Sequence, residues 1–199
     1  MGTTGMLEAI GALIIGGIFM VMMFNAYHNV NVAASNITQQ ISINAITESV
    51  CSMLDSLYLS KVGAGVDSST VAITKAWIRD FKFLGKINPT DPTPSEFYID
   101  QGSYDSDQGG YPLRVKIDGT TVAGPFYMPT QIVFRYFDVQ ENEKNWAELL
   151  FSSQRDLVRS VRIDFELFAD PVEFEGQKAE IKQRIIFWKY FKNLYLRES

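Results

Sequence analysis

Residues that commonly carry enzyme chemistry are scarce in this sequence. His28 is the only histidine and Cys51 the only cysteine, so neither a Ser-His-Asp nor a Cys-His arrangement can be built in the region beyond residue 65. A zinc site with several Cys or His ligands is excluded for the same reason. The chain also has no glycine-rich phosphate loop ending in Lys-Ser or Lys-Thr. Carboxylate pairs such as Asp164 and Glu166 are more simply a solvated strand face, so the sequence favours a protein that is not an enzyme.

One loop could hold a hard cation. Asp105 and Asp107 lie two residues apart and are followed by two glycines, as at the opening of a calcium-binding loop. The fifth position of that loop is Gly109 and the twelfth is Lys116, where such loops carry an oxygen ligand and a glutamate. An ordinary acidic turn explains the same residues. We therefore expect no resident cofactor, and Asp105 with Asp107 is the one calcium candidate.

A single carboxylate, Glu8, stands at the head of a long apolar run. One interpretation is that the dipole of a helix stabilises Glu8 in the first turn, with Thr4 or Gly5 as the cap. The other is that Glu8 pairs inside a membrane with the N-terminal amine or another positive group of a neighbouring subunit. A buried carboxylate without a partner is costly, so it demands such a partner.

The apolar run predicts a transmembrane helix. Sixteen residues from Ala9 to Phe24 carry no polar side chain, and their flanks extend the span to 7–27, about the 20 residues that cross a bilayer. Small residues in such a span permit close helix packing, and they are Gly11, Gly16 and Gly17. A cleaved secretory signal is the alternative, but it needs a basic n-region, and no Lys or Arg occurs before Lys61.

The pattern past the span stays helical. Apolar side chains recur there at three- and four-residue spacing between polar ones, which is typical of one apolar helix face. These side chains are Ile37, Ile41, Ile46, Val50, Met53, Leu54 and Leu57. The glycines of 63–65 suit a helix C-terminus. After a short segment 1–5, we therefore predict one helix over 6–62, with an amphipathic continuation over 28–61.

Beyond residue 65 the apolar pattern alternates as in half-buried β-strands. The clearest sets are Ile132, Phe134 and Tyr136, and Val161, Ile163, Phe165 and Leu167. The dipeptide at 118–119, Asp-Gly, suits a type I′ hairpin turn. Residues 159–169 and 178–196 are expected to form a wide antiparallel hairpin that ends in a strand. The predicted fold class is α+β, a long N-terminal and partly transmembrane α-helix followed by a mainly antiparallel β domain over 66–199.

Composition excludes one further class. The chain has 199 residues, 46% of them hydrophobic, and a formal net charge of −5, which leaves room for one domain and an anchor. A general nucleic-acid binder would need clustered Lys and Arg to neutralise phosphates. Only the stretch 178–199 is net basic, so we expect no nucleic-acid partner.

The layout resembles that of a known superfamily. A glutamate at the head of an apolar helix, a polar amphipathic continuation and a C-terminal β domain together look like a type IV pilin or a pseudopilin of type II secretion. The runs IVFRYFD, RSVRIDFEL and IIFWKYFKNL are most similar to its larger minor subunits. In such a protein the helix is held in the inner membrane, a prepilin peptidase trims the N-terminus, and the helices pack in a filament core. The chain departs from this pattern where the glycine before the cleavage point would be expected, because Thr3 stands there, and the basic leader is missing.

The leading hypothesis is a structural subunit of a pilus-like or type II secretion pseudopilus-like filament, anchored and assembled through its N-terminal helix. Its partners would be copies of itself or related pilin-like subunits, and the resemblance implies that Glu8 sets subunit register, beside Gly11, Gly16 and Gly17. The C-terminal domain would lie outside the cytoplasm, either at a bacterial inner membrane or in a cell-surface filament.

The alternative is a single-pass, membrane-anchored extracytoplasmic binding or adaptor module that does not polymerise. Its β domain would present Trp188, Tyr190, Phe191 and the net-basic tail to a soluble partner. A third class, a membrane-bound hydrolase, rests on Asp and Glu pairs alone.

Overall fold

The computed structural model describes residues 3–168, 172–174, 177–179 and 182–196. The chain forms two compact units, residues 1–42 with 169–181, and residues 43–168 with 182–199. The long helix α1 (Thr3–Ser52) contributes to both. It is followed by a π-helical turn, η1 (Met53–Tyr58), and a 3-10 turn, η2 (Leu59–Lys61). A long N-terminal helix followed by antiparallel sheets confirms the predicted α+β class.

The observed ends of the helical region lie close to the predicted bounds of 6 and 62. Helix α1 begins at Thr3, three residues before the predicted start at residue 6. Helical structure ends at Lys61, where Gly63 and Gly65 follow with φ angles of 72° and 63°. Glycine adopts this left-handed region without the steric penalty of a Cβ. The predicted helix stop is therefore confirmed.

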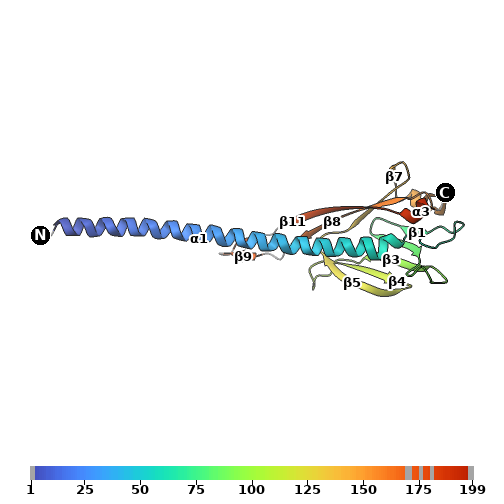
Figure 1. Ribbon diagram of the computed structural model, residues 1–199, viewed down its shortest axis with the longest axis horizontal. Coiled ribbons are helices and arrows are strands. Elements are labelled where there is room, and N and C mark those ends of the chain that lie inside the picture. The colour runs from blue at the N-terminus through green and yellow to red at the C-terminus, as the bar shows by residue number, and fades with distance from the viewer. Residues whose placement is uncertain (1–2, 169–171, 175–176, 180–181, 197–199) are drawn as a thin grey trace. The chain divides into compact units, whose positions relative to one another are not determined.

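The second unit contains two antiparallel sheets (Figure 1). Five strands of the first sheet follow one another in chain order, β1 (Ile73–Ala76), β2 (Asp80–Gly85), β3 (Ser95–Gln101), β4 (Tyr111–Ile117) and β5 (Thr120–Met128). The second sheet has the order β11-β8-β6-β7, with β6 (Val133–Phe137), β7 (Glu143–Lys144), β8 (Ser160–Phe168) and β11 (Lys182–Tyr190). Between β7 and β8 lie a 3-10 turn, η3 (Glu148–Leu150), and a short helix, α2 (Ser152–Arg155).

The predicted hairpin at Asp118-Gly119 is confirmed. Ile117 of β4 pairs with Thr120 of β5, and the two residues between them have φ angles of 49° and 82°. Two positive φ angles define the type I′ turn, whose twist matches the twist of the strands it joins.

The hairpin at the end of the chain differs in part from its prediction. Strands β8 and β11 pair antiparallel over nine residues, from Lys182↔Phe168 to Tyr190↔Ser160, as expected. The segment between them contains its own pair of short strands, β9 (Val172–Phe174) and β10 (Gln177–Ala179). Strand β9 lies where only a turn was predicted, whereas β10 falls mostly at the start of the predicted second arm. The predicted last strand is also shorter than expected, because β11 stops at Tyr190 and a short helix, α3 (Lys192–Tyr195), follows in the described part of the chain.

The core of the second unit lies between its two sheets and the end of the helix. Phe83 of β2 stacks on Phe97 of β3 with ring centroids 5.1 Å apart, and Phe81 stacks on Phe191 at 5.8 Å. Leu54 of η1 and Val50 of α1 belong to the same buried cluster. The helix end is thus part of the core of the domain.

The helix face that enters this core matches the predicted one only in part. Val50 and Leu54 are buried as predicted, together with Ile43 and Tyr58, whereas Ile37, Ile41, Ile46 and Leu57 are exposed. A π-helical turn rotates each residue less than an α-helical turn does, because it has more residues per turn. A prediction that keeps the α-helical period through η1 therefore places Leu57 on the buried face, whereas the structure leaves it exposed.

Candidate assembly surface and an apolar groove

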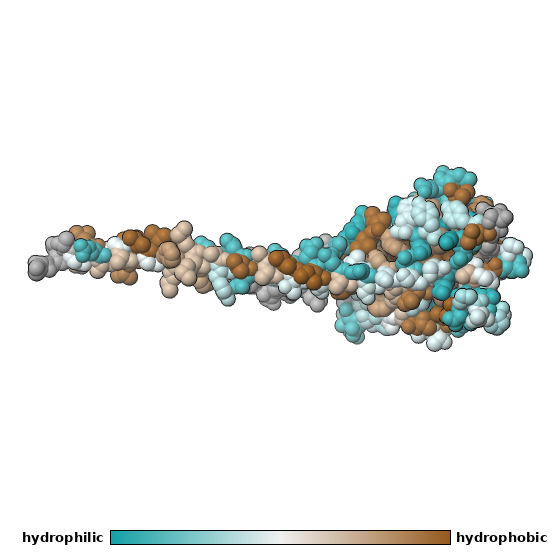
Figure 2. All heavy atoms as spheres, in the orientation of Figure 1, coloured by the Kyte–Doolittle hydropathy of each residue, from teal (hydrophilic) through white to brown (hydrophobic). Residues whose placement is uncertain are grey.

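The N-terminal part of α1 presents apolar side chains in all directions. Leu13 is 76% exposed, Phe19 64% and Met20 75%, and Figure 2 shows the apolar surface of this segment. Its most apolar window has a mean hydropathy of 2.2, and it is the one helix in the described part of the chain that is long and apolar enough to cross a membrane. A helix that is apolar all round needs lipid or other helices around it.

The glycines in this segment leave open space on the helix surface. A Cβ built on Gly11, Gly16 or Gly17 meets no heavy atom within 4 Å. At about 100° per residue these three glycines do not share one face. The same geometry puts Gly16 on one narrow stripe with Ala12 and two further small residues, Gly5 and Ala9. Sequence reasoning singled out the glycines and missed this stripe, which three- and four-residue spacing reveals.

The structure corrects one interpretation of Glu8. Because α1 begins at Thr3, its first turn contains no acidic residue, and Glu8 lies in the second turn, beyond the strongest influence of the helix dipole. The Glu8 side chain is exposed, and among the described residues no hydrogen bond or ion pair reaches its carboxylate. First-turn stabilisation therefore does not account for this charge.

The loop with Asp105 and Asp107 closes on itself. Asp105 pairs with Gly110 in an isolated bridge, and its Oδ1 accepts hydrogen bonds from the backbone N–H groups of Asp107 at 3.0 Å and Gln108 at 3.2 Å. Within the described ranges, no group of three or more His, Cys, Asp and Glu side chains could hold a metal ion. These bonds are those of an ordinary acidic turn.

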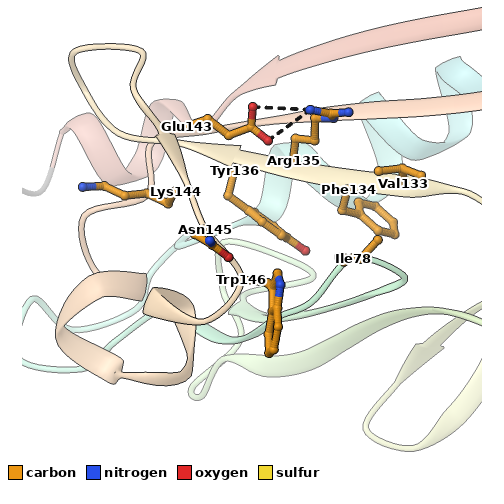
Figure 3. Close-up of a pocket in the computed structure, with 9 residues that line it drawn as sticks. All are labelled: Ile78, Val133, Phe134, Arg135, Tyr136, Glu143, Lys144, Asn145 and Trp146. Atoms are coloured by element: carbon orange, nitrogen blue, oxygen red, sulfur yellow. Dashed lines mark hydrogen bonds and ion pairs between the residues drawn. The ribbon is translucent and has the colours of Figure 1, made fainter.

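An apolar groove that the sequence analysis did not anticipate lies on the second unit. One cavity of about 430 Å³ is lined by Trp77, Ile78, Trp146 and Leu150, together with Arg79 and Asp80. A second cavity, of about 500 Å³, shares Ile78 and Trp146 with it and extends along β6 (Figure 3). The only sequence signal for it is a pair of tryptophans, Trp77 and Trp146, in short segments that follow strands.

The walls of the groove are held by hydrogen bonds. The Tyr136 hydroxyl lies near the carbonyl oxygens of Trp77 at 2.9 Å and Asp80 at 3.3 Å and donates to them. Complete burial raises the pKa of Tyr136 well above its ordinary value, and the charge of Asp80 adds to this effect. On the opposite wall Arg155 donates to the carbonyl oxygens of Leu149 at 2.9 Å and Leu150 at 2.8 Å.

Most charges around the groove are paired. Arg135 and Glu143 form an ion pair at 3.3 Å, drawn above Tyr136 in Figure 3. Lys75 and Asp80 approach to 2.9 Å. Arg79 is exposed and has no such partner in the described part of the chain.

In the alternative hypothesis, three aromatic residues near the end of the chain form one binding surface. The structure does not present them together. Phe191 is only 1% exposed and belongs to the core, because it stacks on Phe81. Trp188 packs against Phe137 with ring centroids 4.4 Å apart. Only Tyr190 is largely exposed, and its hydroxyl donates to Glu141 at 2.9 Å. These three residues do not form one presented surface.

One member of the carboxylate pair on β8, Asp164, is also engaged in an ion pair. Asp164 accepts a hydrogen bond from Nε of Arg184 on β11 at 2.9 Å. This bond, against the opposing effect of burial and with the positive charges of Arg184 and Arg162 nearby, lowers the pKa of Asp164 below its ordinary value. A carboxylate held ionised in this way cannot serve as a general acid near neutral pH.

Comparisons with known proteins give no relative. No family model, no curated protein and no solved structure matches the chain.

Proposed function

We propose that this protein is a non-enzymatic structural subunit of a pilus-like or type II secretion pseudopilus-like filament. Its N-terminal helix anchors it in a membrane, and packing of that helix against those of neighbouring subunits assembles the filament. The C-terminal domain lies outside the cytoplasm, at a bacterial inner membrane or on a cell-surface filament.

One observation carries this proposal, namely a lone carboxylate in a helix segment that is apolar all round. Glu8 is followed by the apolar span, and no described residue of its own chain pairs with it. In hydrocarbon an unpaired carboxylate is expensive, so it draws a positive or hydrogen-bonding group from a neighbouring chain. A simple anchor needs no such charge, whereas a subunit that must take up one register does.

The stripe of small residues supports the same proposal. Apolar side chains gain little by moving from lipid to a helix interface, so helices in membranes associate through close packing at small residues. Ala12 and Gly16 stand four residues apart, the small-xxx-small spacing that favours close approach. The open space at Gly16 is available to a neighbouring helix.

The test compares Glu8→Gln with Glu48→Gln in the full chain produced in its native host. Both changes remove one carboxylate from α1, but Glu48 lies beyond the apolar span. We expect Glu8→Gln to remain in the membrane fraction and to lose most of its filament or sedimentable assembly, while Glu48→Gln assembles as the parent does. If both variants assembled equally well, the proposed role of Glu8 in assembly would be wrong.

A second pair of variants tests the packing of the helix. Gly16→Leu with Gly17→Leu fills the open surface, whereas Ile14→Leu with Ile15→Leu keeps the bulk and the hydropathy of the span. The first pair is expected to block assembly and the second to leave it intact. Blocked assembly in both would point to a general effect on membrane insertion.

The groove favours a second candidate, a membrane-anchored binding module that does not polymerise. Its apolar walls at Trp77 and Trp146 are exposed by 47% and 54%, as in a binding surface. In that protein any apolar helix of equal length serves as anchor. Replacing residues 6–27 by an unrelated transmembrane helix therefore separates the two candidates. A filament subunit should lose assembly, whereas a binding module should keep its binding.

A further inference from the structure

The apolar groove belongs to a larger apolar patch on the second unit. Four large apolar side chains that line the two cavities are between 46% and 54% exposed, namely Trp77, Ile78, Trp146 and Leu150. Phe151, 65% exposed, follows Leu150 directly in the chain. Large aromatic side chains bury about 150–250 Å² each. At half exposure, three aromatic and two aliphatic side chains present on the order of 400 Å² of apolar surface. That is the size of the largest apolar patch on a typical monomer, and such patches often mark interaction sites.

The size of the patch suits one side of a protein interface. A standard interface buries about 800 Å² on each partner, with an apolar centre and a polar rim. The patch supplies such a centre. Each cavity, at about 430 or 500 Å³, can also receive a large side chain as an anchor.

The rim carries one unpaired charge of each sign. Arg79 stands beside Trp77 and Ile78 on one wall, and Glu148 stands between Trp146 and Leu150 on the other. Both charged side chains are exposed, and neither has an ion-pair or hydrogen-bonding partner for its charge among the described residues. A surface with a free cation on one wall and a free anion on the other is complementary to itself.

We propose that this patch binds a second copy of the same chain. A two-fold axis through the groove places the 77–79 wall of each copy against the 146–150 wall of the other, and so pairs Arg79 of one copy with Glu148 of the other twice. Such an isologous contact closes on itself. It does not depend on the filament proposal, because it uses no residue of the membrane span.

Both walls are already fixed before the copies meet. The Tyr136 hydroxyl holds the 77–80 turn through the carbonyl oxygens of Trp77 and Asp80. Arg155 fixes the 146–150 wall to β1, the strand that precedes the 77–79 wall, since it donates to Leu150 at 2.8 Å and through Nε to Ile73 at 3.0 Å. A preformed surface loses little conformational entropy on binding.

The test is site-specific photocrosslinking of the full chain in membranes. Phe151, 65% exposed beside Leu150, is replaced by the photoreactive benzoylphenylalanine in one tagged copy, and a second tag marks the other copy. We expect a crosslinked homodimer whose linked peptide contains residues 73–85 of the partner. A link only to helix α1, only to a different protein, or no link at all would overturn the proposal.

Charge reversal separates this contact from a folding effect. Arg79→Glu alone and Glu148→Arg alone put like charges together twice in each homodimer, so each is expected to lower the crosslink yield by about tenfold. Mixing the two variants restores opposite charges at both contacts and is expected to restore the yield. Lys192→Glu, an exposed reversal on α3, is the control that leaves the yield unchanged. If the crosslink yield of the mixture stays as low as that of each single variant, the proposed pairing of Arg79 with Glu148 is wrong.

Discussion

Replacing Leu54 by alanine tests whether the end of the long helix is part of the domain core. The Leu54 side chain is fully buried in η1, at 0% exposure, within the cluster that joins both sheets. Truncating it removes apolar contacts and leaves a cavity, which costs about 2–5 kcal/mol for a buried leucine. We expect a loss of about 3 kcal/mol, or roughly 10 °C in Tm for a domain of this size.

Leu57 provides the matched control for Leu54. It lies three residues further along the same turn and is 58% exposed, so Leu57→Ala should change stability by less than about 0.5 kcal/mol. Unfolding of the full chain in detergent can be followed by tryptophan fluorescence, because Trp77, Trp146 and Trp188 all lie in the second unit. Similar small losses for both variants would refute the reasoning, since the helix end would then contribute nothing particular to the core.

Three further variants test separate parts of the domain. Tyr136→Phe removes the hydroxyl that holds the groove wall and should cost about 1 kcal/mol, as measured by urea unfolding, because the carbonyl oxygen of Trp77 loses its donor, whereas that of Asp80 keeps the backbone N–H of Trp77. The pKa of Asp164 is lowered in the folded state, so its contact with Arg184 stabilises the protein above the ordinary pKa of 3.8 and is lost as the pH falls through the lower folded value. The stability difference between the parent and Arg184→Gln should therefore be present at pH 7 and shrink at pH 2, and a constant difference would contradict this account. Gly119→Ala meets no neighbouring atom but forces a Cβ onto a residue at φ 82°, and thermal unfolding should show a loss of about 1 kcal/mol.

The parts of the fold that depend on local chemistry could be predicted from the sequence. The Asp118-Gly119 turn follows from two residues that tolerate positive φ angles, and the helix stop follows from Gly63 and Gly65. The pairing of β8 with β11 follows from alternating apolar residues on both strands. Each of these signals lies within a few residues of the feature it predicts.

The buried helix face and the groove could not be predicted in the same way. The π-helical turn η1 changes the phase of the helix by a backbone feature that no residue type announces. The groove brings Trp77 together with Trp146, about seventy residues later in the chain, and only the register between the strands sets that distance. Phe191 looked like a surface aromatic because it follows an alternating strand, yet the chain turns there into α3 and buries it.

The most direct test of the central claim is cysteine crosslinking along the membrane span in native membranes. Cys51→Ser removes the only native thiol, and single cysteines are then placed at Ala12 and Gly16, on the stripe of small residues, and at Ile14, on the opposite side of the helix. Assembly through the stripe of small residues predicts crosslinked subunits with the highest yields at 12 and 16, where the helices approach most closely. Chains that enter the membrane fraction but form no crosslink at any of the three positions would contradict assembly through this helix.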